Sequence, residues 1–279
     1  MLNYKSLLGQ AQQQCLHKGF EKSRAEWLML DLFHWNKTDL LLHLNDEVTA
    51  EHLKLYEKAT ERMLTGEPIQ YIVGHQTFYG ETFKVNQHCL IPRPETEEVM
   101  LHFFHQLKHE DQVVDIGTGS GNIPIMLKKL DPTLKVYATD LYSEPLEIAK
   151  DNAKKHNTEI NFLQGDTLTP LFEQGLKFNG LISNPPYIDN EEAKMMEETV
   201  LKYEPHHALF AESHGYQIYD QILSQLPKVL LPHAKVVFEI GFKQGEQLKQ
   251  MIYERYPHLE VNLIKDINGN NRIISFEWI

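Results

Sequence analysis

The sequence of 279 residues is poor in cysteine and contains no long apolar run. Its two cysteines, Cys15 and Cys89, are too far apart to form the close pair that metal sites use. We therefore expect a reducing compartment, without structural disulfides, and a cytoplasmic location. No stretch approaches the roughly eighteen apolar residues of a membrane span, so we expect no membrane partner. The first residues also lack the apolar core of a secretory signal.

An excess of basic charge is also missing, because 27 Lys and Arg stand against 39 Asp and Glu, for a net charge of −12. Proteins that read duplex DNA normally carry a basic footprint. We therefore expect no direct nucleic-acid binding. Histidine is frequent, and His102 and His105 form an H-x-x-H pattern, but no Cys/His cluster accompanies it. We interpret this pair as one face of a helix and predict no bound metal.

The first 73 residues are predicted to form a small helical domain. Apolar residues recur at three- and four-residue spacings in three segments, 4–18, 24–35 and 50–65. Ser23 and Thr49 precede two of these segments and are candidate N-caps. About 70 residues is near the lower limit for independent stability, so we expect an appended domain.

Residues 74–93 are predicted to form a β-hairpin linker. Gly74 and Gly80 punctuate short strand-like pieces at 76–78 and 82–85. Two interpretations remain open for the aromatic residues of this segment, Phe78, Tyr79 and Phe83: they line a substrate channel, or they pack the linker. Pro94 then suits the first turn of a helix that extends to residue 107.

Residues 94–279 are predicted to form an α/β domain with a doubly wound, mostly parallel sheet. Strands are expected at 112–116, 135–140, 160–164, 180–183, 235–240, 259–264 and 272–278. Helices are expected between them at 122–130, 145–156 (with Ser143 as its cap), 190–201, 216–230 and 245–255. The turn at 268–270 is too short for a crossover helix, so the last strand should be antiparallel to its neighbour.

A glycine-rich turn, Asp115-Ile116-Gly117-Thr118-Gly119-Ser120-Gly121, follows the first of these strands. Its glycines allow the backbone to approach a ligand closely. The third glycine comes one position earlier than in the dinucleotide fingerprint, and Asn122 occupies the expected place. Asp115 disfavours a diphosphate and favours a cationic group such as a sulfonium. The alternative is a tight turn without a ligand.

Two further carboxylates follow the next strands. Asp140 is about twenty residues downstream, where a carboxylate can accept both hydrogen bonds of a ribose diol; alone, it could equally cap a helix. Asp166 lies where an adenine edge could be read, and Thr167 and Leu168 are candidates to pack on the ring. Together, these acidic strand ends favour a nucleoside ligand.

The segment Asn184-Pro185-Pro186-Tyr187 follows a buried strand. Prolines stiffen the chain and leave carbonyl oxygens as acceptors of fixed direction. Asn184 adds a side-chain acceptor, so a planar NH2 group can donate both hydrogens, and Tyr187 offers a face for stacking. Such contacts raise the electron density on a poorly nucleophilic nitrogen and aim its lone pair. Methyl transfer would need no base beforehand, since the proton can leave afterwards. Alternatively, the segment is only a polyproline turn.

Together these two motifs resemble S-adenosylmethionine-dependent class I methyltransferases that act on a planar nitrogen. Three further segments, 66–74 (GEPIQYIVG), 90–97 (LIPRPETE) and 204–209 (EPHHAL), resemble the protein-(glutamine-N5) methyltransferases that modify peptide chain release factors. This similarity extends over essentially the whole chain. It implies a seven-stranded sheet, and as substrate the glutamine of the Gly-Gly-Gln loop in release factors.

The resemblance also assigns residues, with S-adenosylmethionine as co-substrate, S-adenosylhomocysteine as product and no metal. Its cofactor contacts fall on Gly117, Thr118, Gly119, Ser120, Gly121, Asp140 and Asn184. Its substrate clamp falls on Asn184, Pro185, Pro186 and Tyr187, of which Asn184, Pro185 and Tyr187 would be catalytic. The N-terminal domain would contact the release factor away from the target glutamine.

Two other functions remain open. An adenine-N6 nucleic-acid methyltransferase would use the same amine clamp on a base flipped out of a duplex. A non-catalytic adaptor would keep the cofactor pocket and act through the N-terminal helices.

Overall fold

The computed structural model describes residues 2–189 and 197–279, and the chain divides into two compact units. Among the described residues, the first unit holds those up to His75 together with Glu197–Tyr203, and the second unit holds the remainder. The chain therefore returns to the first unit after the Asn-Pro-Pro-Tyr segment. Among the helices of these described ranges, none is both long and apolar enough to cross a membrane.

The first unit is helical, as its sequence periodicity predicts. It contains α1 (Tyr4–His17), α2 (Ser23–Phe33), α3 (Lys37–His43), α4 (Ala50–Met63), α5 (Ile69–Val73) and α10 (Glu198–Tyr203). The Thr49 hydroxyl accepts a hydrogen bond from the His52 N–H, so this predicted N-cap is confirmed. The predicted cap at Ser23 is wrong, because Ser23 is the first helical residue and Lys22 precedes it without a side-chain cap.

Helix α10 joins the first unit through the turn that follows α4. The Tyr203 hydroxyl donates to the main-chain oxygen of Thr65 at 3.0 Å. A Cβ at Gly66 would lie 2.9 Å from a methyl carbon of Thr199, so glycine permits this close approach. Of the helix expected at 190–201, residues 190–196 lie outside the described part of the chain.

A β-hairpin leads from the first unit, which includes His75, into the second. Strands β1 (His75–Phe78) and β2 (Glu81–Lys84) are joined by Tyr79 and Gly80, which both have positive φ, as a type I′ hairpin turn requires. Phe78 and Phe83 are fully buried in a core cluster with α6 and the central strands. The packing interpretation therefore holds for these two rings, while Tyr79 is exposed.

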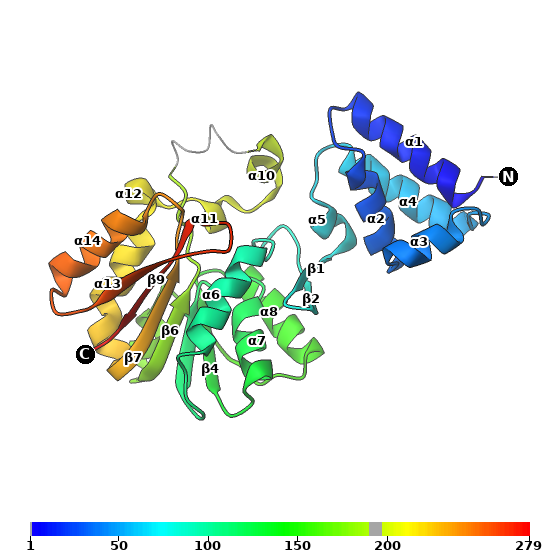
Figure 1. Ribbon diagram of the computed structural model, residues 1–279. Helices are drawn as coiled ribbons and strands as arrows, with labels where there is room; N and C mark the ends of the chain where they lie inside the picture. Colours follow the sequence, from blue (N-terminus) through cyan, green and yellow to red (C-terminus); the bar gives the residue numbers. More distant parts are fainter. Residues whose placement is uncertain (1, 190–196) are drawn as a thin grey trace. The chain divides into compact units, whose positions relative to one another are not determined.

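The second unit is built on one sheet of seven strands, which confirms the predicted fold class. The strand order is β5-β4-β3-β6-β7-β9-β8, and β9 is antiparallel to both of its neighbours (Figure 1). The strands are β3 (Gln112–Ile116), β4 (Lys135–Asp140), β5 (Asn161–Gln164), β6 (Phe178–Ser183), β7 (Leu230–Glu239), β8 (Val261–Lys265) and β9 (Asn271–Glu277).

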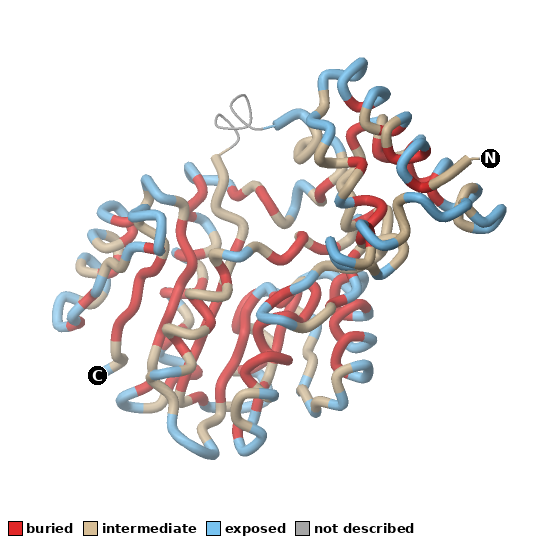
Figure 2. The backbone as a smooth tube through the Cα atoms, turned by 45° about the vertical axis from the view of Figure 1, so that its right-hand side comes forward, coloured by how far each residue is buried: buried red, intermediate tan, exposed pale blue. Residues whose placement is uncertain are grey.

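Helices cover both faces of this sheet, because the central strands are apolar on both sides. On β3, Val113 packs with α6 (Pro94–Phe104), α7 (Asn122–Leu130) and α8 (Ser143–Lys155). The next residue, Val114, packs with α9 (Thr169–Glu173), α13 (Gln217–Val229) and α14 (Gly245–Arg255). The same alternation occurs at Leu181 and Ile182 of β6 and at residues 236–238 of β7, as the period of two of a strand requires. Figure 2 shows the central strands as the most deeply buried part of this unit.

Some element ends differ from the sequence prediction. Pro94 occupies the first turn of α6 as predicted, but the helix ends at Phe104. Ser143 is the first residue of α8 rather than its cap. The short helices α11 (His206–Leu209) and α12 (Glu212–Gly215) were not predicted, because one turn of helix has no detectable periodicity.

Candidate active site

Strand register brings the two sequence motifs to one edge of the sheet. On β3, Ile116 pairs with Thr139 of β4 and with Ser183 of β6. Gly117, Asp140 and Asn184 are the next residue in each case, so β3 and β6 place side by side two motifs that lie far apart in sequence. The strand order reverses direction at β3, and such a switch point leaves a crevice at the carboxyl ends of the strands.

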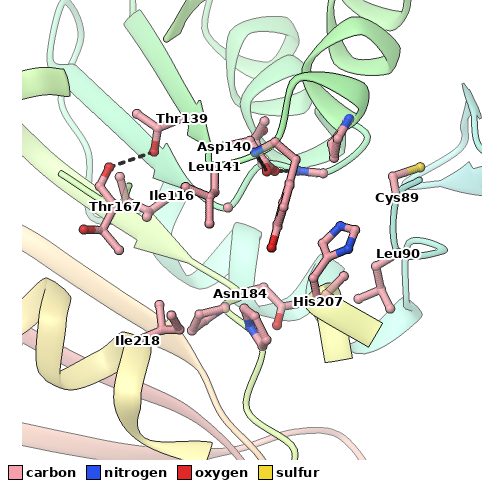
Figure 3. Close-up of a pocket in the computed structure, with 18 of the residues that line it drawn as sticks. Cys89, Leu90, Ile116, Thr139, Asp140, Leu141, Thr167, Asn184, His207 and Ile218 are labelled. Carbon is pink, nitrogen blue, oxygen red and sulfur yellow. Dashed lines mark hydrogen bonds between the residues drawn. The ribbon is translucent and has the colours of Figure 1, made fainter. Parts of the chain in front are cut away.

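A cavity of roughly 410 Å³ opens at this edge, within the second unit. Most of the predicted site residues line it: Gly117, Thr118, Gly119, Ser120, Asp140, Asn184, Pro185 and Pro186. Gly121 and Tyr187 are not among the lining residues. Figure 3 shows Asp140 and Leu141 on one side of the cavity, with Asn184 and Ile218 on the other. Its size lies within the range of ligand pockets.

The glycine-rich turn is held against β4 by its own backbone. The N–H groups of Gly117 and Thr118 both donate to the Thr139 carbonyl at 2.9 Å. A Cβ at Gly117 or Gly119 would meet no atom within 4 Å, so the glycines leave room for a ligand. Gly121 has a packing role, because a Cβ added at this position would lie 2.9 Å from the Ala149 Cβ on α8. It allows α7 and α8 to pack closely, and the direct cofactor contact predicted for it stays a prediction.

Asp140 is the carboxylate best placed to bind a diol. Its Oδ2 accepts from the Gly119 N–H at 3.0 Å and its Oδ1 from the Tyr142 N–H at 3.1 Å. Burial raises the pKa of this carboxyl, and the two backbone N–H groups oppose that shift. A carboxylate oxygen can accept a second hydrogen bond, so each oxygen can still receive one hydroxyl from the cavity.

Asp115 is a buried carboxylate beneath the glycine turn, one residue before the end of β3. Within the described part of the chain, neither carboxylate oxygen has a hydrogen-bond partner. Burial raises the pKa of this group to about 7, and the neighbouring Thr118 hydroxyl opposes the shift. An uncompensated buried carboxyl favours a cationic group nearby. The turn and Asp140 line the cavity and fit a nucleoside; Asp115 does not line it, and can act on a bound cation only through the turn above it.

Replacing Asp115 with asparagine is expected to stabilise the ligand-free protein at high pH. The pKa of Asp115 in the folded state, about 7, lies above its ordinary value of 3.8. Folding therefore favours the protonated form, and the wild type loses stability as the pH rises from about 4 to about 7. Asparagine does not titrate, so its advantage should grow across this window by up to about 4 kcal/mol at pH 8. Thermal unfolding at pH 4.5 and pH 8 measures it.

The same variant should bind S-adenosylmethionine about tenfold more weakly at pH 8, because it removes a negative charge near a cationic ligand. Calorimetry measures this affinity. A gain in stability that is equal at both pH values would contradict the ionisation of a buried carboxyl at this position.

The region after the third strand differs in part from the prediction. Asp166 and Thr167 line the cavity, and the Asp166 Oδ2 accepts from the Gln221 amide at 2.5 Å. The prediction that Leu168 packs on an adenine ring is wrong, because this side chain is fully buried in the core. Ile218 and Gln221 of α13 complete this side of the cavity instead. They were missed because a helix that lies late in the chain gives no local signal of a ligand.

Asn184 is held in the cavity wall by a hydrogen bond from its Nδ2 to the Thr96 hydroxyl at 3.2 Å. Its Oδ1 has no partner among residues 2–189 and 197–279. Pro185 is buried and Pro186 is half-buried, and both line the cavity beside it. The predicted acceptor side chain therefore faces the same cavity as Asp140.

Tyr187 lies at the end of this segment, and its surroundings restrain its main chain. Its carbonyl oxygen accepts from the Gln244 amide at 2.8 Å. A Cβ at Gly215, where φ is +83°, would lie 2.0 Å from the same oxygen. Burial raises the pKa of the Tyr187 phenol to about 12. Gly215 and Gln244 thus hold the segment in place, and neither was predicted, since both follow Tyr187 at a distance in the sequence.

An ion pair joins the segments 90–97 and 204–209, and its arginine lines the cavity. The Arg93 guanidinium donates to the Glu204 carboxylate at 2.5 Å, and the Glu204 side chain is nearly fully buried. Beyond Glu204, the His207 ring lies 4.1 Å from the Tyr142 ring and lines the cavity near Asp140. Across the described ranges, no three His, Cys, Asp or Glu side chains gather as a metal site.

Comparison with known proteins is consistent with this architecture. The family models described as "PrmC N-terminal domain" and "Methyltransferase small domain" match residues 6–74 and 95–212. A release factor glutamine methyltransferase of Staphylococcus aureus is 53% identical over 278 residues, covering 100% of both chains. One from Bacillus anthracis is 39% identical over 93% of both. A methyltransferase structure from Pyrococcus furiosus, 20% identical, covers 79% of this chain and 98% of its own, with a TM-score of 0.55, and so shares the fold.

Proposed function

Because the chain belongs to the release factor glutamine methyltransferase family, we propose that it methylates the side-chain amide nitrogen of the glutamine in the Gly-Gly-Gln loop of peptide chain release factors. One observation carries this proposal for the site itself. Asn184, whose Oδ1 has no partner in the described chain, and Asp140, which we assign to a ribose diol, line the same cavity. A methyl donor and a planar amide can therefore meet there.

We assign the methyl donor to the side of the cavity formed by the glycine turn. The turn from Gly117 to Ser120 would follow the donor's backbone, and Asp140 would accept from its ribose hydroxyls. Asp115 would compensate positive charge from beneath the turn. S-adenosylmethionine supplies, when bound, a methyl group on a sulfonium. Gly121 would contribute indirectly, by seating α7 against α8.

We assign the substrate amide to the side formed by Asn184, Pro185 and Pro186. The Asn184 Oδ1 and the Pro185 carbonyl oxygen would accept the two hydrogens of the glutamine NH2 group. These contacts strengthen as positive charge develops on nitrogen, which is the kind of interaction that lowers a barrier. Tyr187 would act mainly by anchoring the segment, since its ring is not among the lining residues. The N-terminal helical unit would contact the release factor away from the glutamine.

The other two functions have less support. The net charge of −12 disfavours an adenine-N6 methyltransferase of duplex nucleic acid. A non-catalytic adaptor would not need the side chains of the amide clamp, and the cavity keeps Asn184, Pro185 and Pro186 together.

The direct test is incubation with labelled S-adenosylmethionine and a release factor, beside the same factor with its Gly-Gly-Gln glutamine changed to alanine. We expect methylation of the first protein only, with mass spectrometry locating the methyl group on the glutamine side chain. Equal incorporation into both proteins would refute the proposed substrate. Methylation of adenine in DNA, with binding that falls steeply with salt, would support the alternative.

A further inference from the structure

The Asn184 side chain is an amide with two unlike ends, and only one end suits the proposed substrate. A glutamine NH2 group carries two donors and needs an acceptor. If Asn184 turned its own NH2 group to the cavity, two donors would face each other. Something in the protein must therefore decide which end of the Asn184 amide faces the ligand.

The hydrogen bonds of the neighbouring Thr96 hydroxyl distinguish the two ends of the Asn184 amide. Thr96 lies in the first turn of α6, is buried, and lines the cavity. Its hydroxyl donates to the Glu239 Oε2 at 2.6 Å. A hydroxyl has a single hydrogen, so only lone pairs remain for Asn184. The observed bond from the Asn184 Nδ2 to this hydroxyl is the complementary one, and it leaves Oδ1 for the cavity.

Glu239 is placed beside Asn184 by the sheet. Phe238 of β7 pairs with Ser183 of β6, so Glu239 and Asn184 are the next residues on neighbouring strands. The carboxylate is buried, and an ionised carboxylate can only accept hydrogen bonds. It therefore forces the Thr96 hydroxyl to point its hydrogen away from Asn184. In the protonated form it could donate instead, and both orientations of the amide would become possible.

Several charged or titratable groups surround Glu239. Arg272 of β9 and Arg93, before α6, favour its ionised form, whereas Glu95 of α6 and burial disfavour it, and burial is the largest effect. These influences together raise the pKa of Glu239 to about 7. Tyr187 lies close enough for its phenol to interact electrostatically with Glu239. Tyr219 of α13 donates its hydroxyl hydrogen to the main-chain oxygen of Glu239 at 2.6 Å, and its phenol interacts with the carboxylate only electrostatically.

We propose that Thr96 and Glu239 are positioning residues: the carboxylate orients the hydroxyl, and the hydroxyl orients the Asn184 amide so that its oxygen faces the substrate nitrogen. Neither residue would touch the reacting atoms through this relay. The inference rests on the proposed role of Asn184 as an acceptor for the substrate amide. It adds a reason why a threonine in the LIPRPETE segment and a glutamate at the end of β7 belong to the same site.

The main test compares Thr96→Val with Thr96→Ser. Valine keeps the shape but leaves the Asn184 NH2 group without its partner, so we expect the kcat to fall about tenfold, with the Kd of S-adenosylmethionine within about threefold. Serine keeps the hydroxyl and should retain kcat within about threefold. Tyr219→Phe is the matched control: it removes a buried hydrogen bond to Glu239 that is not part of the relay, and should leave kcat unchanged.

A double variant separates a positioning role of Thr96 from a general structural effect, because the losses of kcat should not add if Thr96 acts through Asn184. In an Asn184→Ala background, Thr96→Val should cause little further loss of kcat, because its target is already gone. A full additional tenfold loss, or a wild-type kcat in Thr96→Val, would overturn the relay. If Thr96→Val does not fold, the conservative Glu239→Gln variant tests the relay instead. In the wild type, kcat at saturating substrate should fall as the pH decreases through about 7, because Glu239 becomes protonated. In Glu239→Gln, this pH dependence of kcat should disappear.

A measurement on the ligand-free protein is independent of methyl transfer. Nuclear Overhauser effects from the Asn184 side-chain NH2 protons should reach the Thr96 methyl protons, because Nδ2 faces the Thr96 hydroxyl. NH2 protons that show no such contact would overturn the relay even if the enzyme methylates release factors. Failure to methylate glutamine, with the NH2 contact present, would instead refute the proposed function and leave the orientation of the amide established.

Discussion

Replacing Asn184 with alanine is expected to lower kcat by about 10²–10³-fold, because one preorganised polar contact to the reacting group is lost. The acceptor contact matters most when positive charge develops on the substrate nitrogen, so the loss should appear in kcat more than in binding. The Kd of S-adenosylmethionine should stay within about threefold of the wild type. Single-turnover kinetics with a release factor and calorimetry with the methyl donor measure the two effects separately.

Asn179→Ala is the matched control for this change. Asn179 lies toward the other end of β6, where its side-chain oxygen accepts from the Gln112 N–H at 2.9 Å. Its loss should lower the thermal stability without changing kcat. Near-normal turnover of Asn184→Ala would refute the amide clamp, whatever the outcome for the control.

Replacing Asp140 with alanine is expected to have the opposite signature: a large loss of cofactor affinity with a smaller effect on turnover. The carboxylate is placed to accept from two ribose hydroxyls, and hydrogen bonds to a charged group contribute about 1.5–3 kcal/mol each. The Kd of S-adenosylmethionine should therefore rise by about 10²–10⁴-fold. The variant also frees the Gly119 N–H, which loosens the glycine turn. At saturating methyl donor, kcat should recover to within about tenfold of the wild type.

Asp151→Ala provides the control for charge. Asp151 is an exposed carboxylate on α8 that forms an ion pair with Lys84 at 2.6 Å. Its removal changes the net charge equally but leaves the cavity intact, so the Kd of S-adenosylmethionine should not change. A Kd of Asp140→Ala that matches this control would show that the ribose does not bind at Asp140.

Several parts of the fold were readable from the sequence because their signals are local. Strands β3 and β4 and helices α7 and α14 were predicted with the same bounds as observed, since apolar periodicity, glycine turns and chain length act within a few residues. The antiparallel final strand followed from a turn too short to cross the sheet. Capping was less predictable: Thr49 caps α4, but Ser23 and Ser143 entered their helices instead.

Residues of the candidate site were predictable from the sequence only where they belong to a short motif. The glycine turn, Asp140 and the Asn-Pro-Pro-Tyr segment each have a distinctive local pattern, and most of their residues line the cavity. The prediction for Leu168 failed because a side chain that follows a strand can point to the cavity or to the core, and the sequence does not say which. Tyr187 shows the same difficulty, since Gly215 and Gln244 decide where its segment lies.

By itself, the sequence determined the long helices and the strands, their order along the chain, and the chemical types at the strand ends, because these depend on neighbours in the chain. Only the tertiary structure decided which of these groups meet. Thr96 and Asn184 are 88 residues apart and Thr96 and Glu239 are 143 apart. Their hydrogen bonds exist because parallel strands end at one edge and α6 packs beside it. Burial then gives Asp115 and Glu239 their raised pKa values, because desolvation depends on what surrounds a carboxyl in three dimensions.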